Sequence, residues 1–133
     1  MKLRKMISLC LVLGLLLSAC GGDVSHVRRI PGESELYSDG EIRSAMKVVA
    51  DFFRREFDGC TMTEIRYEEE KYAERQRAEA QNYGAEVIIL LTDFMVDSSG
   101  GGGSLNPNST YRNYQWTLTR TLFGWELQDW GYG

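Results

Sequence analysis

The chain has 133 residues, with 15 basic and 19 acidic side chains and a formal net charge of −4 at pH 7. A chain of this length can build one domain around one hydrophobic core. The excess of acidic residues and the lack of a basic stripe argue against nucleic acid as a partner.

The start of the chain has the pattern of a secretory signal peptide. Three basic residues within the first five positions precede an apolar run over residues 6–17, and the small residues Ser18 and Ala19 follow that run. A helix of this length, at about 1.5 Å per residue, is too short to cross a hydrocarbon layer of about 30 Å. We therefore expect residues 1–19 to be a cleaved signal peptide rather than a membrane-spanning helix.

A cysteine follows directly, in the sequence Leu17-Ser18-Ala19-Cys20. This tetrapeptide resembles the bacterial lipobox, and the resemblance implies that Cys20 becomes the lipidated N-terminus of a palmitate-bearing lipoprotein. Acyl chains hold such a protein on a bilayer without a spanning helix. The implied location is the extracytoplasmic face of the bacterial cell membrane. The alternative is an ordinary signal peptide that happens to end near a cysteine.

Cleavage before Cys20 changes the charge and the available chemistry. Twelve basic residues then remain against nineteen acidic ones, so the mature chain carries about −7 and has no basic face for anionic lipid or nucleic acid. With Cys10 removed and Cys20 lipidated, Cys60 has no partner for an intrachain disulfide. Cys60 is therefore either a small core residue or a reactive thiol.

Residues 20–37 contain glycine, proline and mixed charge without periodicity, which indicates a lipidated tether. The single histidine, His26, lies in this segment, so no histidine is positioned as the base of a Ser-His-Asp or Cys-His site. A single globular domain is expected over residues 38–133.

Two helices are predicted in this domain. Ser38 lies three residues before Glu41, which is the spacing of a capping box, and apolar side chains then recur at three- and four-residue steps as far as Phe57. Gly59 ends this helix. A second helix is expected over residues 68–83, where acidic residues favour the helix start and few side chains are apolar.

Two strands are predicted ahead of a glycine-rich segment. Residues 60–67 alternate between polar and apolar side chains, as in a short strand with one buried face. Residues 85–96 are apolar at odd and even positions alike, which is typical of a central strand covered on both faces.

The segments 111–122 and 125–132 are predicted to form a hairpin. If Phe123-Gly124 is the two-residue turn, one face of the hairpin is apolar and the other mostly polar. Trp130 and Tyr132 then fall on the polar face.

The order of these elements predicts an α+β domain, with N-terminal helices packed on a curved antiparallel four-stranded sheet. The pattern resembles the cystatin-like architecture of the ketosteroid-isomerase and nuclear-transport-factor-2-like superfamily, in which a sheet wraps round a helix and leaves a cone-shaped pocket. The segments "ESELYSDGEI", "VDSSGGGGSLNPNSTY" and "DWGYG" are similar to small uncharacterised bacterial lipoproteins that carry such a domain. That resemblance implies no particular activity.

The glycine-rich stretch "DSSGGGGSLNPNST" occupies residues 97–110. A phosphate-binding loop needs a lysine followed by Ser or Thr after its last glycine, and the stretch contains no lysine. Counted as a calcium loop, it has Ser99 and Gly101 where carboxylates are needed. We therefore expect a mobile connector and no cofactor or metal, with a ligand lid as the alternative.

One group of side chains is a candidate ligand site. If the 97–110 loop joins its strands symmetrically, Asp93 lies opposite Tyr114, and Trp116 and Asp129 share the same apolar face. A carboxylate beside a tyrosine hydroxyl can abstract a proton next to a carbonyl, as in the isomerases that the fold resembles. The alternative is that Asp93 is a strand-end residue hydrogen-bonded to Tyr114 or to loop amides.

These patterns favour a membrane-anchored lipoprotein whose domain is a non-enzymatic module that binds an unknown protein or small molecule. One alternative is a small-molecule enzyme that uses Asp93 and Tyr114 inside the cone; an open cone of about 300 Å³ or more would be compatible with it. Another alternative is a structural module of the envelope that forms a homodimer through the outer face of its sheet.

Overall fold

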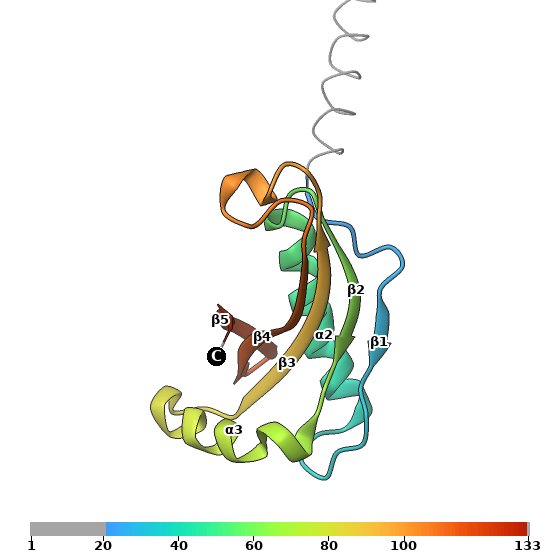
Figure 1. Ribbon diagram of the computed structural model, residues 1–133. Helices are drawn as coiled ribbons and strands as arrows, with labels where there is room; N and C mark the ends of the chain where they lie inside the picture. The colour runs from blue at the N-terminus through green and yellow to red at the C-terminus, as the bar shows by residue number, and fades with distance from the viewer. Residues whose placement is uncertain (1–20, 133) are drawn as a thin grey trace, which may run out of the picture.

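The computed structural model describes residues 21–132. The predicted signal peptide over residues 1–19 and the predicted lipidation site at Cys20 lie outside the described residues. The elements in chain order are β1 (Arg28–Ile30), α2 (Asp39–Glu56), β2 (Cys60–Arg66), α3 (Glu69–Tyr83), β3 (Val87–Val96), the single turn η1 (Gly101–Gly103), β4 (Thr110–Thr121) and β5 (Gly124–Gly131). They form an α+β domain, as predicted (Figure 1).

The five strands within residues 21–132 form one sheet in the order β1-β2-β3-β4-β5. Strands β2 to β5 are antiparallel neighbours and correspond to the four predicted strands, whereas β1 adds a fifth strand that runs parallel to β2. The sheet is therefore mixed, and the prediction of four antiparallel strands is wrong at this edge. Neither helix of the described part is long and apolar enough to span a bilayer.

The segment predicted as a tether is instead part of the fold from its first described residues. The Gly22 amide donates to the carbonyl oxygen of Arg54 at 3.0 Å, and the Asp23 amide donates to that of Cys60 at 2.8 Å. Further along the same segment, β1 pairs with β2. The sequence did not predict this edge strand over Arg28–Ile30, because a three-residue strand is too short to produce a periodic pattern.

Helix α2 begins as the capping-box spacing predicts. The Ser38 hydroxyl oxygen accepts a hydrogen bond from the Glu41 amide at 3.1 Å, and Gly59 follows the helix with a positive φ of 70°. Figure 1 shows the curved sheet running beside this helix. The helix supplies the centre of the core, and its buried residues are Ile42, Ala45, Met46, Val49, Ala50 and Phe53.

Strand β3 is the central strand of the sheet, as predicted. Its residues Val87, Ile89 and Leu91 are as fully buried as Ile88 and Leu90. Successive side chains of a strand point to opposite faces, so both faces of β3 are covered.

The β4–β5 hairpin turns one residue earlier than predicted. Thr121 pairs with Gly124, so the two turn residues are Leu122 and Phe123, which are 90% and 96% exposed. Further along, the register shifts where Thr117 pairs with Asp129 and the next residue of β4 pairs with Leu127.

This register shift changes the orientation of Trp130 in β5 and of Tyr132, which follows the strand. The Trp130 ring centroid lies 4.6 Å from that of Phe52 on α2, and the Tyr132 ring lies 5.5 Å from that of Tyr114. The prediction that Trp130 and Tyr132 lie on the polar face is wrong, because an extra residue in a strand moves all later side chains to the opposite face.

Helix α3 is joined to the sheet by one buried amide. Gln76 is the residue of α3 that the structure shows as buried. Its Oε1 accepts a hydrogen bond from the Ile89 amide at 2.9 Å, and its Nε2 donates to the Tyr67 hydroxyl at 3.1 Å. The prediction that this helix buries little is confirmed, and the contact that holds it is polar.

Replacing Gln76 with Ala should lower the free energy of unfolding by about 1–3 kcal/mol, because the buried Ile89 amide loses its acceptor. Urea denaturation followed by circular dichroism measures the effect. Gln81→Ala, at an exposed position of the same helix, is the matched control and should stay within about 0.5 kcal/mol of wild type. Equal stability of the two variants would contradict the role of Gln76.

Candidate functional site

The predicted site depends on the register between β3 and β4, and the structure has a different register. Tyr114 pairs with Thr92, one residue away from its predicted partner Asp93. Neighbouring residues of a strand point to opposite faces, so Asp93 and Tyr114 lie on opposite faces of the sheet. The symmetric pairing already fails next to the loop, where Met95 pairs with Thr110. The strands then shift register beside Asp93, where Asn113 adopts a positive φ of 58°.

Asp93 belongs to a network of ion pairs. Its Oδ1 lies 3.1 Å from Nη1 of Arg66 and accepts a hydrogen bond from the Asn113 amide at 3.0 Å. The side chains of Asp93 and Arg66 are only 15% and 11% exposed, and Arg66 also pairs with Glu68 at 3.2 Å. Asp93 is therefore hydrogen-bonded to the amide of a β4 residue, and not to Tyr114 or to an amide of the 97–110 loop as the alternative prediction had it.

The remaining predicted residues lie apart from Asp93. Trp116 is fully buried in the core, and its Nε1 donates a hydrogen bond to Oγ1 of Thr92 at 2.8 Å. Asp129 pairs with Thr117 and is exposed on the face away from Trp116. The structure does not assemble the four predicted residues, but Tyr114 lines a groove that the prediction did not include.

This groove lies between the C-terminal end of α2, the 97–110 loop and strands β4 and β5. Its volume of about 400 Å³ is within the range of small-molecule sites. Figure 1 shows the loop, in orange, beside the C-terminal end of α2. We name it the aromatic groove, and the residues that line it are Phe52, Glu56, Phe57, Gly101, Ser104, Leu105, Tyr114 and Trp130.

The aromatic side chains of the groove support one another. The Trp130 ring lies 4.6 Å from that of Phe52 and stacks on that of Trp116, with centroids 6.3 Å apart at an angle of 22°. The Tyr114 ring meets that of Phe57 edge to face at 6.1 Å. Such contacts hold aromatic rings in fixed orientations. Trp130 is nevertheless 42% exposed, so a ligand can reach its ring.

Tyr114 is the lining residue of the groove that carries a phenol group. Burial raises the pKa of Tyr114, and the neighbouring Tyr111 and Tyr132 add to this shift. The hydroxyl therefore stays protonated at neutral pH. Sequence patterns placed Phe52 and Phe57 in the core stripe of α2 and missed Trp130 as a partner, because its face depends on the register shift in β5.

The 97–110 loop forms one wall of the aromatic groove and is therefore more than a connector. Gly100, Gly101, Gly102 and Gly103 all have positive φ, between 60° and 99°, a backbone that other residues rarely adopt. This path brings the Leu105 amide to the Gly100 carbonyl oxygen at 2.9 Å and packs the Leu105 side chain against the core. The position is compatible with the ligand lid that was the alternative prediction.

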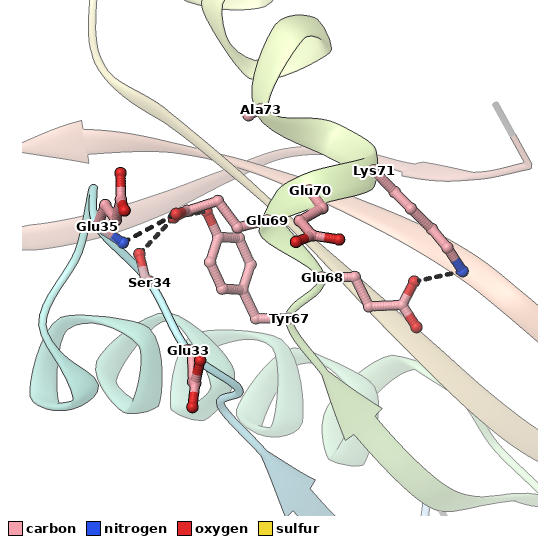
Figure 2. Close-up of a pocket in the computed structure, with 9 residues that line it drawn as sticks. All are labelled: Glu33, Ser34, Glu35, Tyr67, Glu68, Glu69, Glu70, Lys71 and Ala73. Atoms are coloured by element: carbon pink, nitrogen blue, oxygen red, sulfur yellow. Dashed lines mark hydrogen bonds and ion pairs between the residues drawn. The ribbon is translucent and has the colours of Figure 1, made fainter.

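A larger depression of about 870 Å³ lies between the segment before α2 and the start of α3 (Figure 2). Five glutamates line it, with Glu69 at the centre of its contacts. Glu69 accepts hydrogen bonds from the Glu35 amide at 2.8 Å, from the Tyr67 hydroxyl at 3.0 Å and from the Ser34 hydroxyl. We name this depression the acidic cleft. Its contacts hold the segment before α2 against α3, so we assign it a structural role.

Cys60 has no sign of reactivity. It is fully buried, and burial together with the nearby Asp97 and Asp58 carboxylates raises the pKa of its thiol to about 11. The thiol is therefore protonated at neutral pH, and the prediction of a small core residue is confirmed. Within residues 21–132, no three His, Cys, Asp or Glu side chains gather closely enough to hold a metal ion.

Comparison with known proteins does not assign the chain to a family. No family model, curated protein or solved structure matches the chain. A function can therefore be argued only from the residues of the site.

The acidic cleft gives a prediction about pH. Partial burial raises the pKa of Glu69, but the hydrogen bonds from Ser34, Glu35 and Tyr67 outweigh it and hold the pKa below its ordinary value. A carboxyl with a lowered folded-state pKa stabilises the fold above its unfolded pKa of about 4.3, and this contribution is lost as the pH falls through the folded value. Glu69→Gln should be less stable than wild type at neutral pH and should lose less stability below about pH 5.

Thermal unfolding between about pH 3 and pH 7 measures this difference. Glu70→Gln is the matched control, because Glu70 is exposed in the same helical turn, and it should follow the wild-type curve. A Glu69→Gln curve that runs parallel to wild type at every pH would show that this carboxylate does not contribute through its charge.

Proposed function

We propose that the protein is a lipid-anchored, extracytoplasmic binding module whose aromatic groove holds a small ligand. The observation that supports this best is the convergence of Phe52, Phe57, Tyr114 and Trp130 around an opening of about 400 Å³. Rings fixed by mutual contacts, with one ring partly exposed, provide a preorganised apolar surface that needs little rearrangement on binding.

The lipid anchor rests on the lipobox resemblance at Cys20, and the fold near the N-terminus is compatible with it. The Gly59 amide donates to the Gly21 carbonyl oxygen at 3.3 Å, and the Gly22 amide donates to Arg54 at 3.0 Å. An acylated Cys20 would therefore hold the C-terminal end of α2, and with it the aromatic groove, close to the membrane.

A cystatin-like fold is part of this proposal. The curved sheet beside one long helix supports it (Figure 1), since the resemblance implies a sheet that wraps round a helix and leaves a cone-shaped pocket. The isomerase alternative has no comparable support, because it needs Asp93 beside Tyr114 and the register separates them. The carboxylate of the groove is Glu56, on α2.

The anchor is tested by the mass of the mature protein. We expect the purified wild type to begin at Cys20 with acyl chains attached, and to partition with membranes. Cys20→Ser should leave the protein unprocessed or release it from acylation. An intact mass that shows an unmodified thiol at Cys20 would refute the anchor without bearing on the groove.

The groove is tested by a thermal-shift screen of small organic molecules. Compounds that raise the melting temperature of wild type should lose most of that shift in Trp130→Ala, because the exposed ring of the groove is removed. Phe123→Ala is the matched control, since Phe123 is an exposed aromatic residue in the β4–β5 turn and does not line the groove. If both variants keep every shift, ligands bind elsewhere.

A further inference from the structure

We propose that the aromatic groove binds an organic cation, of the alkylammonium or trimethylammonium class. This inference rests on the proposed function of the groove as a ligand site and adds the chemical class of the ligand. Four observations support it: the ring composition of the walls, the single carboxylate among them, the lack of a basic lining residue, and the volume.

The walls are suited to a cation because of the charge distribution of aromatic rings. The faces of Trp, Tyr and Phe rings carry negative potential, and a cation within about 6 Å of a ring centroid is attracted to it. Four such rings, from Phe52, Phe57, Tyr114 and Trp130, line one groove of about 400 Å³. Trp130 is the exposed one of the four, and the buried Phe57 and Tyr114 lie behind it. Cages of this composition bind quaternary ammonium groups, which are weakly hydrated and lose little on entering an apolar site.

The ionisable side chains that line the groove favour a positively charged ligand. Glu56 is the acidic lining residue, and no Lys, Arg or His lines the groove. Among the described residues, no ion pair to Glu56 is formed, whereas its helix neighbour Asp51 pairs with both Lys47 and Arg54. An exposed carboxylate beside the rings would complement a positive ligand and repel an anion.

The volume restricts the size of the cation. About 400 Å³ is near the lower end of the range for small-molecule sites, so the groove accommodates an ammonium head group with a short substituent. The same head group occurs in a free quaternary ammonium compound such as choline and in a lipid that carries choline. Both sources present the same chemistry to Trp130 and Glu56, and the experiment separates them.

The test is a calorimetric titration of the purified processed protein with choline, tetramethylammonium and 3,3-dimethylbutan-1-ol. The last compound has the shape of choline without its charge. We expect choline to bind about tenfold or more tightly than this neutral isostere. Glu56→Gln should weaken choline binding several-fold and leave the affinity for the neutral isostere unchanged. Trp130→Ala should weaken choline binding about tenfold, and Trp130→Phe should weaken it less. Phe123→Ala should bind choline as tightly as wild type.

Glu56 is exposed, so Glu56→Gln keeps the test valid even if a change at Trp130 disturbs packing. Added phosphatidylcholine vesicles should compete with choline if a lipid head group is the source, and phosphatidylglycerol vesicles serve as the comparison. Failure of both to compete indicates a free quaternary ammonium compound. Equal or tighter binding of the neutral isostere overturns the cation proposal but keeps a ligand site in the groove. No binding of choline or tetramethylammonium also overturns it, and the thermal-shift screen then decides separately on the proposed function.

Discussion

The register of the central strands depends on the ion pair between Arg66 and Asp93. The register between β2 and β3 shifts immediately beside Asp93, and so does the register between β3 and β4. Each shift decides which side chains face α2. Because Asp93 accepts from the amide of Asn113 as well as from Arg66, one carboxylate fixes the neighbouring strands on both sides. Tyr114 faces the helix as a consequence, and the aromatic groove follows from that orientation.

The groove is formed by three structural features that lie far apart in the sequence. Phe57 ends α2, the glycine-rich stretch brings Leu105 back against the core, and a register shift in β5 turns Trp130 toward the helix. None of these three features forms a pocket alone. The acidic cleft is larger, yet its central carboxylate at Glu69 is already satisfied by three donors from the protein, whereas the groove leaves Trp130 and Glu56 available to a ligand.

Much of the fold could be predicted because local signals were strong. The Ser38 cap, the apolar stripe that ends at Phe57 and the doubly buried strand β3 all leave periodic patterns in the sequence. The site could not be predicted in the same way. A bulge at Asn113 or in β5 changes the face of every later side chain and has no periodic signature, and the pairing of β1 with β2 is a long-range contact of three residues. The buried amide of Gln76 was missed for a related reason, since a polar residue in a polar helix gives no sign of its burial.

The pairing of the first described residues with β2 has a mechanical consequence. Asp23 and β1 run alongside β2 in the same direction, and both of these contacts are parallel. A force applied at the amino end of the domain would load these hydrogen bonds along the strand direction, so that several must break together instead of one after another. The amino end of the described domain therefore resists pulling along this direction, and the rest of the domain would stay intact under such a load.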